Sequence, residues 1–216
     1  MIAPLPKDSS LPYQFDNLKV LVFGLGRFGG GAGAARFFAS RGAEVVVTDR
    51  MNEEQLAESV ASLSDLPIHR WRLGGHEPSD FERADWIVVN PAVPPGNPLL
   101  KEALQKGRRL VTEIGLFLEW CPTPHVIGIT GSNGKSTTTQ LVHDMLVASG
   151  HTVHLGGNIG RSLLPAIDEI GSDDRVVLEL SSFQLSRLDT APRPRYVAIT
   201  GLTQNHIDWH GSFASA

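Results

Sequence analysis

A strand, a glycine-rich loop and a helix follow one another directly at residues 125–139, and this succession constrains the fold more than any other feature. Residues 126–129 are apolar and mostly β-branched, which predicts a buried strand. Residues 130–134 are small, polar and glycine-rich, which predicts a tight loop. From Lys135 onward, apolar residues recur at helical spacing. The loop and the helix start would together present backbone N–H groups to an anion.

This loop carries the residue types that bind a nucleoside triphosphate. Lys135 can reach the β- and γ-phosphates, and the hydroxyl of Ser136 can bind Mg²⁺. The general pattern has a glycine five residues before Gly134, where this chain has Ile129. The alternative is a turn that binds nothing, although such a turn does not need Gly-Lys-Ser at the helix start. We therefore predict a site for ATP and Mg²⁺ that is lined by Gly131, Ser132, Asn133, Gly134, Lys135, Ser136 and Thr137.

A second glycine-rich turn lies near the start of the chain. A strand is predicted at residues 19–23, and the pattern GxGxxG follows it from Gly24 to Gly29. Another strand is predicted at residues 44–48, and Asp49 stands at its end, twenty residues after the third glycine. This arrangement is typical of βαβ units that bind dinucleotides. It can hold NAD or the diphosphate of another nucleotide, or it can serve only to pack a strand against a helix.

Three more glycines follow this turn, at Gly30, Gly31 and Gly33. Each would cost a helix interior roughly 1 kcal/mol relative to alanine. We therefore expect the helix to begin after a longer loop and to end near residue 41.

The remaining pattern alternates strands and helices, which predicts an α/β fold with two parallel, helix-covered sheets. Helices are predicted at 52–63, 99–106 and 113–120, and strands at 67–71, 85–89, 109–111, 152–155, 175–180 and 195–199. Pro122 and Pro124 mark a domain boundary. We thus expect a Rossmann-like domain at 1–121 and a P-loop ATPase-like domain at 122–216.

Several polar residues follow predicted strands in the second domain. Glu179 can bind Mg²⁺ near Ser136, or it can cap a helix that opens at Ser181. Asn158 lies in a loop between glycines, where its amide can bind a ligand or simply favour a turn. His206 follows the last strand, and the pattern leaves a ligand role and a structural role equally open.

Composition excludes several classes of function. A net charge of −4 and a pI of about 6.0 give no indication of nucleic acid or an anionic membrane as partner. The single cysteine, Cys121, excludes an intrachain disulfide and a cysteine-based metal cluster. The first ten residues lack the charge and apolar pattern of a secretory signal, and no apolar run is long enough for a membrane helix. A cytoplasmic protein is therefore expected.

The sequence TGSNGKST at residues 130–137 resembles the phosphate loop of the Mur ligases, a family with its own variant of the Walker pattern. Residues 157–160 (GNIG), 179–185 (ELSSFQL) and 203–208 (TxxHxD) are similar to the member that adds D-glutamate. The resemblance extends over residues 17–210. It also covers NPAVP at residues 90–94, where the family usually has Ser-Pro-Gly.

This resemblance implies an ATP-dependent ligase of peptidoglycan precursor synthesis. ATP would phosphorylate UDP-N-acetylmuramoyl-L-alanine to an acyl phosphate, and the amine of D-glutamate would attack it. Lys135, Glu179 and His206 would be catalytic, and Ser136, Glu179 and His206 would hold Mg²⁺. The substrate would contact Gly24, Gly26, Arg27, Phe28, Asp49, Arg50, Asn90, Ala92, Asn158, Ser181, Gln184 and His206. The complete protein would be a monomer.

The chain is about half the length typical of the family. It lacks the third domain, which binds the amino acid in relatives, and no lysine follows Lys135. We therefore expect a fragment with a truncated central domain that does not turn over alone. Two alternatives stay open: a binding module for UDP-sugar or nucleotide, and an oxidoreductase that uses NAD at residues 24–49.

Overall fold

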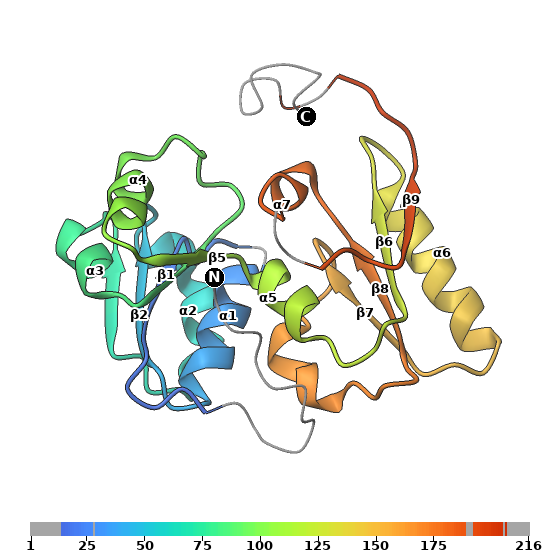
Figure 1. Cartoon of the computed structure of the whole chain (residues 1–216), viewed down its shortest axis with the longest axis horizontal. Helices are drawn as coiled ribbons and strands as arrows, with labels where there is room; N and C mark the ends of the chain where they lie inside the picture. Colours follow the sequence, from blue (N-terminus) through green and yellow to red (C-terminus); the bar gives the residue numbers. More distant parts are fainter. Residues whose placement is uncertain (1–13, 28, 189–191, 205, 207–216) are drawn as a thin grey trace.

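The computed structural model describes residues 14–27, 29–188, 192–204 and 206, and it contains two sheets in which every strand pair is parallel. The sheets lie side by side (Figure 1). Between them lie α1 (Gly30–Ala39), α5 (Glu113–Trp120) and the short helix η2 (Leu164–Glu169). The α/β class with two parallel sheets is therefore confirmed. Within the described residues, no helix is both long and apolar enough to cross a membrane.

The first sheet has the strand order β3-β2-β1-β4-β5. Its strands are β1 (Lys19–Phe23), β2 (Glu44–Asp49), β3 (Arg70–Leu73), β4 (Trp86–Val89) and β5 (Arg109–Val111). The order reverses between β1 and β4, and the carboxyl edge at such a reversal is where open α/β sheets bind ligands. The glycine turn after β1 lies at this reversal.

Helices cover both faces of this sheet because side chains alternate along each strand. Val20 and Val22 of β1 share a core with α1 (Gly30–Ala39), η1 (Glu54–Leu56) and α5 (Glu113–Trp120). Leu21 and Phe23 point to the other face and pack with α3 (Pro78–Arg83) and α4 (Pro98–Gln105). A short helix, α2 (Ala57–Ala61), follows η1 directly.

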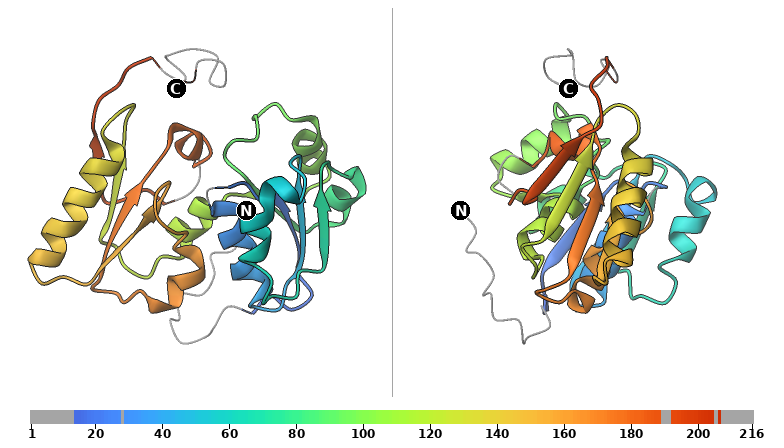
Figure 2. Two further views of the ribbon diagram at one scale, coloured as in Figure 1. Left: turned by 180° about the vertical axis from the view of Figure 1, so that it is seen from behind. Right: turned by 90° about the vertical axis from the view of Figure 1, so that its right-hand side faces the viewer.

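The second sheet has the order β7-β8-β6-β9. Its strands are β6 (Val126–Thr130), β7 (Val153–Gly157), β8 (Arg175–Glu179) and β9 (Tyr196–Ile199), and its helices are α6 (Lys135–Ala148), η2 (Leu164–Glu169) and α7 (Ser182–Leu185). Leu164 and Ile167 of η2 join the core formed by α1 and α5. One apolar core therefore connects the two sheets. Figure 2 shows the two sheets from the opposite side and from one end.

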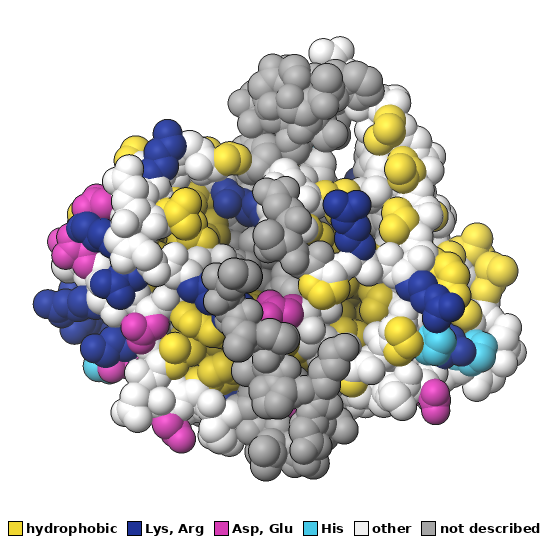
Figure 3. All heavy atoms as spheres, viewed as in Figure 1, with side chains coloured by type: hydrophobic (Ala, Val, Ile, Leu, Met, Phe, Trp, Pro, Cys, Tyr) yellow, Lys and Arg dark blue, Asp and Glu magenta, His cyan; other side chains and the backbone are white. Residues whose placement is uncertain are grey.

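The outer side of the second sheet is apolar and exposed. All four residues of β9 are exposed, as are Leu141 and Met145 of α6. Figure 3 shows hydrophobic side chains gathered on this side of the molecule. Among the described residues, β9 is thus an edge strand that nothing covers.

The expected late start of the first helix is wrong. Helix α1 begins at Gly30 and includes both Gly31 and Gly33. A Cβ on Gly31 would lie 2.3 Å from the carbonyl oxygen of Leu25, and a Cβ on Gly33 would lie 2.3 Å from Ser162 Oγ. Close packing on two sides therefore offsets the low helix propensity of glycine. Helices α3 and η2, which the sequence pattern did not indicate, are also present.

Candidate functional site

The phosphate loop connects β6 to α6, as the sequence predicts. Gly131 and Gly134 adopt φ angles of +135° and +82°, a region that side chains with a Cβ rarely occupy. Lys135 Nζ lies 2.8 Å from the carbonyl oxygen of Gly131 and 3.2 Å from that of Ser132, and it donates to both. The ammonium group is thus held at the mouth of the loop.

The segment after β9 packs against this loop, a contact that the sequence pattern did not indicate. The Ser132 amide donates to the carbonyl of Gly201 at 2.8 Å, and the Ser132 hydroxyl donates to the carbonyl of Thr203 at 2.9 Å. The Thr200 hydroxyl contacts the carbonyl of Thr130 at 3.2 Å. A Cβ on Gly131 would lie 2.4 Å from Thr200 Oγ1, so this close approach also requires glycine.

Glu179 joins the loop to the neighbouring strand. Its carboxylate is buried and accepts from Ser136 Oγ at 2.7 Å and from Asn158 Nδ2 at 3.0 Å. Three predicted site residues from different elements therefore meet at the carboxyl edge of the second sheet. A hydroxyl and a carboxylate are hard oxygen donors of the kind that Mg²⁺ prefers, so this pair fits the predicted ion.

The helix-capping interpretation of Glu179 is wrong, because Ser181 caps α7. The Ser181 hydroxyl accepts from the Gln184 amide, and Gln184 Oε1 accepts from the Ser181 amide at 2.9 Å. This reciprocal pair is a capping box. It fixes both side chains, which were predicted to contact substrate, at the start of α7.

His206 lies against Phe183 of α7, with ring centroids 4.8 Å apart. Among the described residues, no three His, Cys, Asp or Glu side chains are grouped so that they could hold a metal ion. The role of His206 as a ligand therefore stays a prediction.

The first glycine turn is shaped around Asn90. Its Nδ2 donates to the carbonyl of Gly24 at 3.2 Å, and its Oδ1 accepts from the Ala92 amide at 3.0 Å. Gly24 has a φ of +92°, and a Cβ there would lie 2.7 Å from the Cβ of Asn90. Two loops that follow neighbouring strands therefore touch at the order reversal.

Asp49 supports the same turn from the end of β2. Its Oδ2 accepts from the Gly26 amide at 3.0 Å and its Oδ1 from the Met51 amide at 2.9 Å. Arg27 Nε donates to the carbonyl of Gln55 at 3.3 Å, which holds that side chain over η1. Among the other residues predicted to contact substrate, Arg50 is exposed, and Phe28 lies outside the described residues.

A cavity of about 230 Å³ separates the two carboxyl edges. Six of the predicted substrate residues line it: Gly24, Asn90 and Ala92 from the first half, and Asn158, Ser181 and Gln184 from the second. Glu113, which sequence reasoning missed, lines it as well. Arg187 also crosses between the halves and donates to the carbonyl of Val93.

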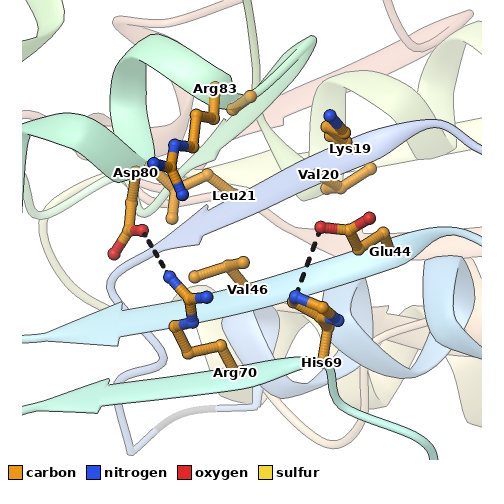
Figure 4. Close-up of a pocket in the computed structure, with 10 residues that line it drawn as sticks. Lys19, Val20, Leu21, Glu44, Val46, His69, Arg70, Asp80 and Arg83 are labelled. Carbon is orange, nitrogen blue, oxygen red and sulfur yellow. Dashed lines mark hydrogen bonds and ion pairs between the residues drawn. The ribbon is translucent and has the colours of Figure 1, made fainter.

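A larger hollow of about 290 Å³ lies at the opposite, amino-terminal edge of the first sheet (Figure 4). Arg70 lies 3.5 Å from Asp80, and His69 lies 3.4 Å from Glu44, so most of its polar side chains contact one another. None of the predicted site residues lines this hollow. The cavity between the sheets is therefore the candidate functional site.

Two known domain families match most of the sequence. Residues 18–112 match the family described as Mur ligase MurD-like, N-terminal domain, and residues 129–215 match the Mur ligase middle domain. The chain belongs to the Mur ligase family. The resemblance seen in the phosphate loop is thus confirmed. The first parallel sheet of this Mur ligase chain lies within the matched N-terminal domain. The second sheet lies within the matched middle domain except for the first three residues of β6, which precede it.

Curated relatives of this Mur ligase chain are named UDP-N-acetylmuramoylalanine--D-glutamate ligase. That of Roseiflexus sp. (strain RS-1) is 42% identical over 92% of this chain, and that of Geobacter metallireducens is 40% identical over 93%. The matched parts are 42% and 43% of those relatives. The chain therefore spans less than half the length of the curated relatives it matches.

Solved Mur ligase structures share the fold. The UDP-N-acetylmuramate:L-alanyl-gamma-D-glutamyl-meso-diaminopimelate ligase of Neisseria meningitides has a TM-score of 0.56 at 17% identity and covers 92% of this chain and 64% of its own. A murein peptide ligase of Psychrobacter arcticus 273-4 has a TM-score of 0.52 at 18% identity, covering 89% of this chain and 44% of its own. At these identities the likeness concerns the fold alone.

Proposed function

We propose that this chain is the part of an ATP-dependent ligase that binds ATP and UDP-N-acetylmuramoyl-L-alanine, in a protein that adds D-glutamate to that substrate. The observation that carries the proposal is the contact of Ser136 and Asn158 with the carboxylate of Glu179. Asn158 also lines one side of a cavity whose other side is formed by Gly24 and Asn90. The names of the curated relatives support the choice of substrates.

In the proposed reaction, a carboxylate oxygen of the muramoyl-alanine attacks the γ-phosphorus of ATP and ADP leaves. The amine of D-glutamate then attacks the acyl carbon, phosphate leaves, and an amide forms. Phosphoryl transfer depends mainly on positioning and charge neutralisation. The loop amides at residues 133–136 would hold the phosphates, since the Ser132 amide already donates to the carbonyl of Gly201. Lys135 would leave its two carbonyl partners to neutralise the transferred group.

Ser136 and Glu179 would hold Mg²⁺, which when bound neutralises phosphate charge. His206 is proposed to lie near a second ion. Asn158 orients the Glu179 carboxylate through its amide. With these roles, the metal would be bound beside Asn158, which lines the cavity that would receive the substrate carboxylate.

The first domain, proposed as residues 1–121, would hold the uridine diphosphate on the turn from Gly24 to Gly29. Asn90 and Asp49 would hold the backbone of this turn in the shape that receives a diphosphate. Asn90 donates to the carbonyl of Gly24, and Asp49 accepts from the amide of Gly26. The second domain, proposed as residues 122–216, would hold ATP. A third domain in the complete protein would bind D-glutamate, so we expect the chain alone to bind its ligands without turnover.

Isothermal titration of the chain with UDP-N-acetylmuramoyl-L-alanine, UDP and NAD tests this proposal. Binding of the first two ligands without NAD is expected. Binding of NAD alone would instead favour the oxidoreductase interpretation. Binding of none of the three by the folded chain would contradict a UDP site in the first domain.

A further inference from the structure

Glu113 is a buried carboxylate in the candidate site that the proposed reaction does not use. It is the first residue of α5, directly after the cap residue Thr112, and its surface is 9% exposed. It accepts from Ser162 Oγ at 2.5 Å and from the backbone amide of Leu164. Both donors belong to the segment that follows β7, so the contact joins the two halves of the molecule.

Helix α1 leaves room for this contact. A Cβ on Gly33 would lie 2.3 Å from Ser162 Oγ, so only glycine allows the serine to approach. Ser162 therefore sits between α1 and the start of α5. Removing this side chain is costly, because Ser162 and the amide of Leu164 would both lose their acceptor.

The segment at residues 157–162 is fixed at both ends. At its start, the Asn158 amide donates to the carbonyl of Glu179 at 2.8 Å, and the Asn158 side chain donates to the Glu179 carboxylate at 3.0 Å. At its end, Ser162 donates to Glu113. Glu113 is thus connected through residues 158–162 to Glu179, the carboxylate proposed to hold Mg²⁺.

We propose that Glu113 is a positioning residue that holds the segment at residues 157–162 against the first domain, and so keeps Asn158 on Glu179. The inference rests on the proposed function for the identity of the ligand. A ligand that touches both sides of the cavity depends on this contact. A ligand that touches only the first glycine turn does not.

A second polar contact between the two halves lies away from the cavity and provides a matched control. Arg41, just after α1, pairs with Asp168 of η2 at 2.5 Å, and neither residue lines the cavity. Asp168→Ala removes a polar contact between the halves without touching the segment at 157–162. This variant therefore shows whether losing any polar contact between the halves weakens ligand binding, or only the loss of the Glu113 contact.

The test compares the wild-type chain with E113A, E113Q, S162A and D168A. Each is titrated with UDP and with UDP-N-acetylmuramoyl-L-alanine, and amide hydrogen exchange is followed at Asn158. We expect E113A and S162A to bind the muramoyl ligand about tenfold more weakly, with UDP binding unchanged. Exchange at Asn158 should accelerate in both variants. E113Q, which keeps an acceptor for Ser162, should restore binding, and D168A should behave as wild type.

The outcomes separate the two proposals. If the wild type binds neither ligand but exchange at Asn158 accelerates in E113A and S162A only, the proposed function fails and the positioning role stands. If the wild type binds both ligands and E113A weakens both equally or neither, the positioning role fails. Should E113A not fold, S162A decides by the same criteria, because it removes the contact from the other side.

Discussion

Ser136 and Glu179 are 43 positions apart in the chain, yet Ser136 Oγ lies 2.7 Å from Glu179 Oε2. The register of parallel strands explains this meeting. Ile129 of β6 is paired with Glu179 of β8, so the residues that follow β6 lie beside the end of β8. The contact brings together two oxygen donors from neighbouring strand ends, and it leads to the first prediction.

Glu179→Gln should remove the dependence of ATP binding on Mg²⁺. The amide can still accept from Ser136, so the fold is kept, but a neutral group binds a divalent cation poorly. We expect ATP affinity in the presence of Mg²⁺ to fall by about tenfold or more, equivalent to at least about 1.4 kcal/mol. Titration with ATP with and without Mg²⁺ measures this. Wild-type dependence on Mg²⁺ in the variant would exclude Glu179 as a ligand.

Gly31→Ala and Gly30→Ala form a matched pair within α1. The added Cβ at residue 31 would meet backbone oxygens 2.3 and 2.5 Å away, whereas at residue 30 it would meet nothing within 4 Å. We expect Gly31→Ala to lower the free energy of unfolding by about 1–3 kcal/mol. Gly30→Ala should raise it by about 0.4–1 kcal/mol. Urea denaturation compares the two, and equal effects would contradict the packing described for this helix.

Glu113→Gln should change how stability depends on pH. Burial raises the pKa of Glu113 from 4.5 to about 7, and its bonds from Ser162 and Leu164 oppose this shift. The folded chain therefore binds the proton more tightly than the unfolded chain, so ionisation of Glu113 costs stability as pH rises from 4.5 towards 7 and beyond. The loss is on the order of 3 kcal/mol. Glu113→Gln should remove this loss between pH 5 and 8 in urea denaturation.

Asp168→Asn is the control for the pH experiment, because this acid lies at the same boundary but is exposed. It should keep the wild-type decline of stability between pH 5 and 8. If Glu113→Gln declines as steeply as the wild type, another group titrates in this range.

Asp49→Ala should weaken the first glycine turn. The buried carboxylate accepts from the amides of Gly26 and Met51, and its loss leaves both donors without this acceptor. We expect the free energy of unfolding to fall by about 1–3 kcal/mol and UDP affinity to fall, with ATP affinity kept. Asp65→Ala, which removes an exposed ion pair with Arg36, should leave stability almost unchanged, because solvent screens such a pair. A loss of ATP affinity equal to that of UDP would contradict a local role.

The strands and both glycine turns could be predicted from the sequence, because their signals are local. Residues 126–129 and 19–23 are largely apolar runs that lead into glycine-rich loops, and the structure contains both strands. The position of Glu179 near Ser136 also followed from the sequence, because residues after parallel strands gather at one edge.

The remaining features depend on contacts between distant residues. In the sequence alone, Gly31 and Gly33 indicate a break in a helix. Their role in close packing is seen only when Leu25 and Ser162 are found beside them in the structure. Glu113 at a helix start is typical of an exposed residue that stabilises the helix dipole, and no local pattern indicates that Ser162 covers it. Helix α3 has Pro78 as its first residue and no side-chain cap, so only the proline marked its start.

Because residue 33 is glycine and has no side chain, it affects how the two halves of the molecule pack together. Because Ser162 Oγ occupies the space where a Cβ would stand, α1 sets how closely the second half can approach. A larger residue at position 33 would push the second half away from α1 and widen the gap between the two glycine-rich loops. The distance that a ligand touching both loops must span therefore depends on Gly33 having no side chain.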